Sequence, residues 1–132
     1  MSLNSLEEIA SYIVSEGKGI LAADESNPTC GKRFDSIGVE STEENRRDYR
    51  EMLFRSAGMK DNIGGVILFD ETIRQDGKDG TSLVNLITDQ GALPGIKVDK
   101  GLQPIGESEE TVTVGLDGLD ERLKEYAALG AR

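Results

Sequence analysis

The most informative stretch of this sequence is Ile63-Gly64-Gly65-Val66-Ile67-Leu68-Phe69, an apolar run that stops abruptly at the acidic pair Asp70-Glu71. A second apolar run, at residues 20–23, stops in the same way at Asp24-Glu25. Short continuous apolar runs of this kind are typical of parallel strands that are buried on both faces. With a further strand expected at residues 93–98, the sequence predicts a sheet of three parallel strands.

Helix signals lie before, between and after these strands. Ser5 and Glu8 have the spacing of a capping box, and so do Ser41 and Glu44. We expect helices over residues 6–14, 29–37, 41–56, 82–90 and 119–129. Strands separated by helical segments favour an α/β fold built from βα units with right-handed crossovers.

The last residues of the chain indicate that only part of such a fold is expected in residues 1–132. Gly130 is placed as the terminator of the last helix, and Arg132 follows two residues later, where a fourth strand should begin. Three parallel strands alone leave two unpaired sheet edges, which natural folds avoid. We therefore expect residues 1–132 to be the N-terminal part of a single larger domain, truncated before its fourth strand.

Composition excludes several classes of function. The 132 residues include 15 Lys and Arg against 25 Asp and Glu, and this net charge of −10 disfavours binding to nucleic acids or anionic membranes. No apolar run is long enough to span a bilayer, no signal sequence is visible, and a single cysteine, Cys30, favours a cytoplasmic location. Because the chain has no histidine, we expect no metal site, and any chemistry must use carboxylates, lysines, arginines and hydroxyls.

Polar residues follow the predicted strands, at the edge of the sheet where parallel α/β proteins place their active sites. Alternation along the third strand separates Lys97 and Asp99 from the apolar side chains of Ile96 and Val98. If the apolar pair meets the helices, Lys97 and Asp99 point into the mouth of a barrel, where Asp24 would join them. Taken alone, Lys97 is interpreted as the first solvated residue after a strand.

A group of cations near these strand ends points to a phosphate site. The expected cluster consists of Lys32, Arg33, Lys97 and Lys100. Charge-assisted hydrogen bonds from such residues, with a hydroxyl such as Ser26 or Thr29, suit a phosphate group. Arg46, which borders the apolar face of its helix, is a weaker candidate. The alternative is that these cations lie on the surface of a generic βα domain.

Several short segments form an ordered series of motifs. They are Gly19-Ile-Leu-Ala-Ala-Asp-Glu-Ser26, Gly31-Lys-Arg33, Thr42-Glu-Glu-Asn-Arg-Arg47, Gly64-Gly-Val-Ile-Leu-Phe69, Gly95-Ile-Lys-Val-Asp-Lys-Gly101, Gly115-Leu-Asp-Gly-Leu119 and Gly130-Ala-Arg132. Over about residues 17–132 this series resembles the class I fructose-bisphosphate aldolases. The resemblance implies a (β/α)8 TIM barrel, of which this chain would supply about the first three βα units.

The resemblance also implies an activity, that of an aldehyde-lyase of glycolysis and gluconeogenesis. The family cleaves fructose 1,6-bisphosphate reversibly to dihydroxyacetone phosphate and glyceraldehyde 3-phosphate. A lysine forms a Schiff base with the substrate ketone, and the protonated imine replaces the metal ion of the other aldolase class, so no cofactor is implied. The imine lysine, the acid–base glutamates and the second phosphate site all follow the position of Arg132, so the isolated chain is expected to be inactive. A cytoplasmic homotetramer is implied for the full-length protein.

Individual residues match positions of the family motifs. Asp24 matches the active-site aspartate that hydrogen-bonds in the imine site and handles protons, and Lys97 matches a lysine that binds the distal phosphate. The residues that match the surroundings of that phosphate are Ser26, Thr29, Lys32 and Arg33, with Thr29 in place of a frequent serine. Glu25 matches an acid that contacts a phosphate-binding arginine elsewhere in the barrel, and Arg46 matches an arginine assigned to substrate binding.

A second hypothesis stays open at this point. A complete short protein could have kept the phosphate half-site without catalysis, as a phosphosugar-binding or interaction module. Its exposed sheet edges would then be covered by a partner or by a second copy of the chain.

Overall fold

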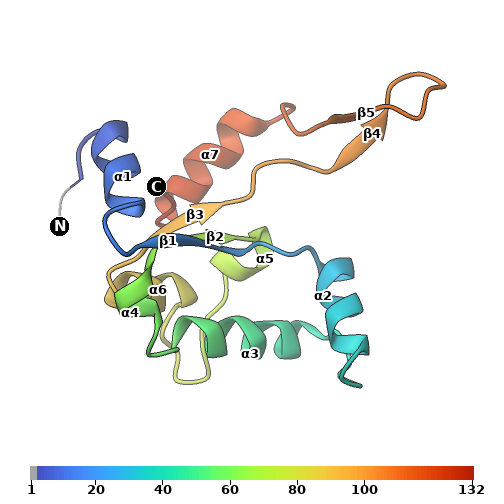
Figure 1. Cartoon of the computed structure of the whole chain (residues 1–132). Coiled ribbons are helices and arrows are strands. Elements are labelled where there is room, and N and C mark those ends of the chain that lie inside the picture. Colours follow the sequence, from blue (N-terminus) through green and yellow to red (C-terminus); the bar gives the residue numbers. More distant parts are fainter. Residues whose placement is uncertain (1–2) are drawn as a thin grey trace.

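The computed structural model describes residues 3–132, with a three-stranded parallel sheet at its centre. The strands are β1 (Gly19–Ala23), β2 (Ile63–Leu68) and β3 (Leu93–Ile96), in the order β1-β2-β3. This order confirms the parallel sheet predicted from the apolar runs (Figure 1). The third strand ends two residues earlier than predicted, at Ile96.

Helices precede, separate and follow the strands. They are α1 (Leu6–Ile13), α2 (Asn27–Asp35), α3 (Glu43–Phe54), α4 (Met59–Asn62), α5 (Asp70–Ile73), α6 (Leu83–Asp89) and α7 (Leu119–Ala128). Helices α3 and α6 pack against each other on one face of the sheet (Figure 1). In residues 3–132, no helix is both long and apolar enough to cross a membrane.

The core lies between the sheet and the helices on that face. Val66 and Leu68 of β2 are almost fully buried there, together with Phe54 of α3 and Ile87 of α6. The other face is more open, since Ile20 of β1 is 53% exposed. The expectation that this strand is buried on both faces is therefore wrong for the described part of the chain, whose elements leave one side of β1 uncovered.

Helix α1 packs against β2 at a point where the apolar run contains two glycines. A Cβ atom on Gly64 would lie 2.2 Å from the carbonyl oxygen of Ile13, and one on Gly65 would lie 3.1 Å from Cγ2 of Ile13. The hydroxyl of Tyr12 also donates a hydrogen bond to the carbonyl oxygen of Gly91. The glycines in the motif thus allow α1 to lie directly against the strand.

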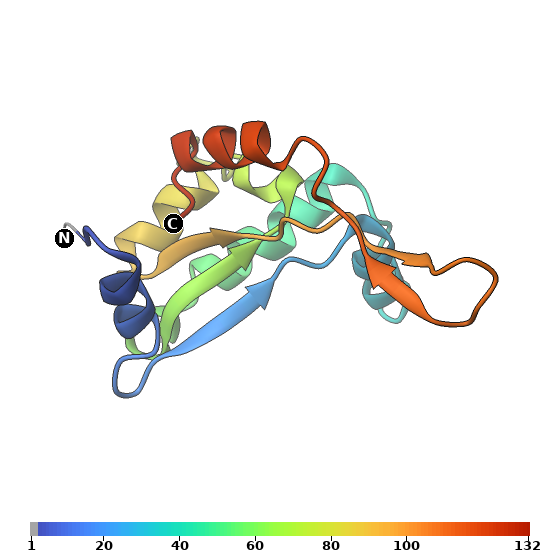
Figure 2. The ribbon, with the colours of Figure 1, turned by 90° about the horizontal axis from the view of Figure 1, so that it is seen from above.

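Several local features differ from the prediction. The capping box at Ser5 is confirmed, but α3 is capped by Thr42, whose hydroxyl accepts the N–H of Asn45 at 3.1 Å, and not by Ser41. The short helices α4 and α5 were not predicted, and neither were the antiparallel strands β4 (Leu102–Pro104) and β5 (Thr111–Thr113). Figure 2 shows the β4–β5 hairpin projecting beyond the sheet.

Candidate functional site

The carboxyl ends of the three strands lie side by side. Ala23 of β1 pairs with Leu68 of β2, which in turn pairs with Ile96 of β3. The residues that follow, Asp24 and Lys97, are therefore two strands apart at one edge of the sheet, at a distance of about 10 Å. The backbone N–H of Lys97 continues the pairing by donating to the carbonyl oxygen of Leu68 at 2.9 Å. This is the convergence that the sequence predicted for the strand ends.

A cleft of about 610 Å³ opens at this edge of the sheet. It is lined by Ser26 after β1, by Phe69 and Asp70 after β2, by Lys97, Asp99, Lys100 and Gly101 after β3, and by Arg122 and Tyr126 of α7. Lysine, arginine, hydroxyl and carboxylate groups thus come together from three strand ends and one helix. Such a set can bind a phosphate through charge-assisted hydrogen bonds.

Lys97 and Asp99 line the same cleft, as predicted, although both follow the end of β3 at Ile96. The ammonium of Lys97 lies 2.5 Å from Oδ2 of Asp99, and the N–H of Gly101 donates to Oδ1 at 2.9 Å. The hydrogen bond from Lys97, followed by that from Gly101, lowers the pKa of Asp99. At neutral pH the carboxylate is therefore ionised and holds the lysine at the mouth of the cleft.

Asp24 and its neighbours occupy the loop between β1 and α2. Asp24 is half-buried and, within residues 3–132, its side chain makes no hydrogen bond or ion pair, so its carboxylate is available to other groups. The hydroxyls of Ser26 and Thr29 lie 3.1 Å apart. Ser26 lines the cleft, whereas Asp24 and Thr29 are not among the described residues that line it.

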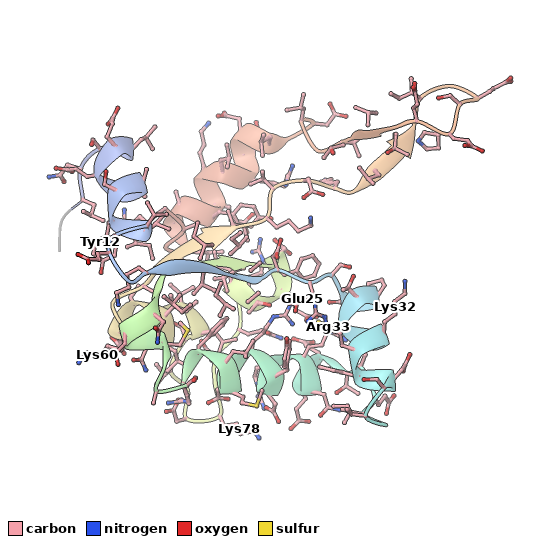
Figure 3. The ribbon with its side chains drawn as sticks, in the orientation of Figure 1. Tyr12, Glu25, Lys32, Arg33, Lys60 and Lys78 are labelled. Atoms are coloured by element: carbon pink, nitrogen blue, oxygen red, sulfur yellow. The ribbon has the colours of Figure 1, made fainter. Side chains whose placement is uncertain are left out.

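The predicted cluster of four cations is divided in the structure. Lys97 and Lys100 line the cleft, but Lys32 and Arg33 are not among the described residues that do so. Both lie on α2, where the guanidinium of Arg33 is 3.4 Å from Oε1 of Glu25. Figure 3 shows Arg33 turned toward Glu25 and Lys32 on the outer side of the helix.

Glu25 and Arg46 have partners within the chain. The carboxylate of Glu25 accepts the Tyr49 hydroxyl at 3.2 Å and lies 3.1 Å from the Arg50 guanidinium. Arg46 is buried and donates to both carboxylate oxygens of Glu71, at 2.8 Å each. This pairing lowers the pKa of Glu71. It also joins α3, which carries Arg46, to α5, which carries Glu71.

Sequence reasoning missed the contribution of α7 to the cleft. The hydroxyl of Tyr126 donates to Asp70 at 2.8 Å, and Arg122 donates to the carbonyl oxygens of Val98 and Gly115. A weak signal was present, because Arg122 and Tyr126 are four residues apart and share a helix face. No group of three or more His, Cys, Asp or Glu side chains in the described region could hold a metal ion.

Parallel α/β enzymes bind their substrates at the carboxyl edge of the sheet, and this chain has a parallel sheet with a polar cleft at that edge. Residues 5–132 match the family model described as fructose-bisphosphate aldolase class-I. The chain therefore belongs to the class I fructose-bisphosphate aldolase family, which confirms the resemblance seen in its motifs.

Individual relatives show how much of such a protein the chain covers. It is 56% identical to a probable fructose-bisphosphate aldolase class 1 of Xanthomonas campestris, with 100% of this chain and 40% of the relative aligned. It is 52% identical to fructose-bisphosphate aldolase 3, chloroplastic, of Arabidopsis thaliana, covering 98% of this chain and 33% of the relative. The chain thus spans two fifths or less of the length of these relatives.

A solved structure has the same fold over nearly all of the chain. It is the fructose-bisphosphate aldolase of Plasmodium falciparum in complex with TRAP and a small-molecule inhibitor. The TM-score is 0.91 at 53% sequence identity, over 94% of this chain and 36% of that one. The α/β architecture read from the sequence is therefore that of an aldolase.

Proposed function

We propose that this chain forms the first three βα units of a class I fructose-bisphosphate aldolase barrel. The reaction is the reversible, metal-free Schiff-base cleavage of fructose 1,6-bisphosphate to dihydroxyacetone phosphate and glyceraldehyde 3-phosphate. The observation that carries the proposal is the pair of lysines, Lys97 and Lys100, in a cleft at the carboxyl edge of the sheet of an otherwise acidic chain. The uncovered face of β1, where Ile20 is 53% exposed, is the face that a closed barrel turns inward.

In this mechanism Lys97 binds the distal phosphate of the substrate. Its ammonium already lies at the mouth of the cleft, where Asp99 holds it. Lys100 adds a second positive charge, and the hydroxyl of Ser26, which also lines the cleft, adds a hydrogen bond. Thr29 supports Ser26 through the contact between their hydroxyls.

Asp24 handles protons at the imine site. Its carboxylate is half-buried and has no side-chain partner within residues 3–132, so it is able to accept a hydrogen bond from a bound substrate. The lysine that forms the imine belongs to the part of the barrel that would follow Arg132. The 132 residues alone are therefore proposed to be catalytically inactive.

The remaining candidates act less directly. Lys32 and Arg33 lie on α2, so their contribution is to the electrostatic field at the entrance, with Arg33 also pairing with Glu25. Arg46 is held by Glu71 and supports the loops around the cleft. We propose a cytoplasmic homotetramer for the whole protein; among relatives of this chain, chloroplastic aldolases also occur.

The test is to extend the reading frame beyond the codon for Arg132 and to assay the encoded protein for cleavage of fructose 1,6-bisphosphate in the presence of EDTA. We expect turnover that resists the chelator, and borohydride reduction in the presence of substrate should attach the triose covalently to one lysine. The proposal is overturned if turnover requires a divalent metal or if no lysine is modified.

The role of Asp24 is tested with the variant Asp24→Asn in the same protein. Turnover should fall by about 100-fold or more with substrate binding largely kept, since general acid–base groups contribute about 10²–10⁴-fold. The matched control is Asp120→Asn, the same chemical change on the exposed side of α7. If the frame stops at Arg132, the phosphosugar-binding module replaces the enzyme, and Lys97-dependent binding of fructose 1,6-bisphosphate without cleavage would establish it.

A further inference from the structure

Arg50 of α3 is the least exposed charged residue that the structure describes, with 2% of its surface accessible. Its Nε donates to the carbonyl oxygen of Ala23 at 3.0 Å, and its Nη2 donates to the carbonyl oxygen of Glu25 at 2.8 Å. These two carbonyl groups stand on either side of Asp24. A single guanidinium therefore holds the backbone before and after this residue.

The other contacts of Arg50 reach the same loop. Nη1 donates to Sγ of Cys30 at 3.1 Å, and Nη2 lies 3.1 Å from Oε2 of Glu25. Cys30 in turn belongs to the first turn of α2, where its N–H donates to the carbonyl oxygen of Ser26 at 2.9 Å. All four polar contacts of the guanidinium thus go to residues 23–30, which form the end of β1, the loop and the start of α2, while its plane also lies over the ring of Tyr49.

Burying a guanidinium group carries a large desolvation penalty. Taking it out of water is unfavourable unless its donors are all used, and an apolar side chain of similar size packs at lower cost. What arginine provides and an apolar residue does not is a rigid planar fork that fixes several acceptors at once. Here the acceptors are main-chain carbonyl groups on both sides of a candidate catalytic carboxylate.

We propose that Arg50 is the positioning residue for Asp24 and Ser26, an inference that rests on the proposed aldolase function. Arg50 is not among the described residues that line the cleft. It acts by fixing the main chain from Ala23 to Glu25, so that the Asp24 carboxylate and the Ser26 hydroxyl keep their places at the carboxyl edge of the sheet. Helix α3 is in this way part of the apparatus that orients the site.

The experiment uses Arg50→Lys in the full-length protein that contains this chain. Lysine keeps the positive charge, but its single nitrogen cannot reproduce a planar fork aimed at two carbonyl groups. The matched control is Glu51→Gln, the next residue of α3, which is also buried. Glu51 contacts Arg55 and the N–H of Lys78 instead of the β1–α2 loop.

Both variants are expected to melt at a lower temperature than the wild type, but only Arg50→Lys should lose turnover. A displacement of about 1 Å at a reacting group costs up to about 100-fold, so we expect kcat to fall about 10- to 100-fold with a smaller change in KM. In the Asp24→Asn background, Arg50→Lys should lower kcat little further, because the group that it positions is already disabled. Equal losses of kcat in the two backgrounds, or an unchanged kcat in Arg50→Lys, would overturn the proposal.

A second measurement separates this inference from the aldolase proposal. If the wild-type protein does not cleave fructose 1,6-bisphosphate, the proposed function fails, whatever Arg50 does. In that case, hydrogen exchange still tests whether Arg50 fixes the main chain of residues 23–30. Arg50→Lys should speed amide exchange in residues 23–30, and Glu51→Gln should speed it in residues 76–82 instead. Unchanged exchange in residues 23–30 of Arg50→Lys would overturn the inference that Arg50 fixes this part of the main chain.

Discussion

The ion pair between Arg46 and Glu71 joins α3 to α5 and allows a quantitative test of the fold around the cleft. Nε and Nη2 of Arg46 donate to the two carboxylate oxygens of Glu71 at 2.8 Å each. The two side chains are only 11% and 20% exposed. The substitution Glu71→Gln keeps the size of the side chain but removes its charge and one acceptor, which leaves the buried guanidinium without its counter-charge.

The size of the effect follows from what Arg46 retains. Removing one partner of a buried ion pair costs about 3–5 kcal/mol. Nη1 of Arg46 keeps its bonds to the carbonyl oxygen and hydroxyl of Ser41, at 2.7 and 3.1 Å. Glutamine also keeps one acceptor, so we expect the free energy of unfolding to fall by about 2–3 kcal/mol. The control is Asp120→Asn, since Asp120 pairs with Lys124 on α7 with both side chains about three-quarters exposed, and such pairs contribute little.

The assay is urea unfolding followed by far-UV circular dichroism, at neutral pH and then at falling pH. The hydrogen bond from Arg46 lowers the pKa of Glu71 below its ordinary 4.5. Its charged form therefore contributes stability above that pH, and this contribution is lost as the pH falls through the folded-state pKa. The gap between wild type and Glu71→Gln should be full at neutral pH and close in acid. A loss no larger than that of Asp120→Asn, or a gap that does not change with pH, would refute the reasoning.

Three further outcomes are expected. Gly64→Ala places a methyl group 2.2 Å from the carbonyl oxygen of Ile13, so α1 must move and urea unfolding should show a loss of about 1–3 kcal/mol; an unchanged midpoint would contradict this. Lys97→Ala in the full-length protein should raise KM for phosphorylated substrates more than for unphosphorylated analogues, and equal increases would make Lys97 a structural residue. The hydrogen bond from the N–H of Thr81, followed by that from Arg55, lowers the pKa of Asp79 to about 2. The difference in free energy of unfolding between wild type and Asp79→Asn should therefore shrink between pH 3.8 and about 2. A difference that persists in stronger acid would argue against a stabilising role for these two hydrogen bonds.

The sequence predicted the elements that are long or strongly patterned. The apolar run at residues 63–69 and the capping box at Ser5 are local signals, and both correspond to observed elements. The position of the α3 cap was missed by one residue because Ser41 and Thr42 both carry a hydroxyl, and only the fold decides which of them meets the first turn. The helices α4 and α5 have four residues each, too few to show a periodic pattern.

The candidate site was predicted only in part, for a different physical reason. Lys97 and Asp99 line one cleft as predicted, but strand alternation is not the whole reason, because β3 ends at Ile96 and Lys100 and Gly101 line the cleft as well. A helix after a loop has no direction fixed by strand alternation, and on α2 Arg33 pairs with Glu25 and is not among the described residues that line that cleft. Arg122 comes from a helix that follows the β4–β5 hairpin, and only the tertiary structure brings it to the strand ends.

The charges in the cleft bear on how a phosphate would bind and leave. Lys97 is already paired with Asp99, whose lowered pKa keeps it an anion at neutral pH. A phosphate that binds Lys97 must share or displace this carboxylate, so the net gain on binding is smaller than for an unpaired lysine. For the reversible reaction that we propose, this is an advantage, because Asp99 orients the ammonium before the phosphate arrives and takes its place when the phosphate leaves. The net charge of −10 also weakens the binding of anions, because it repels those that do not reach the lysines of the cleft.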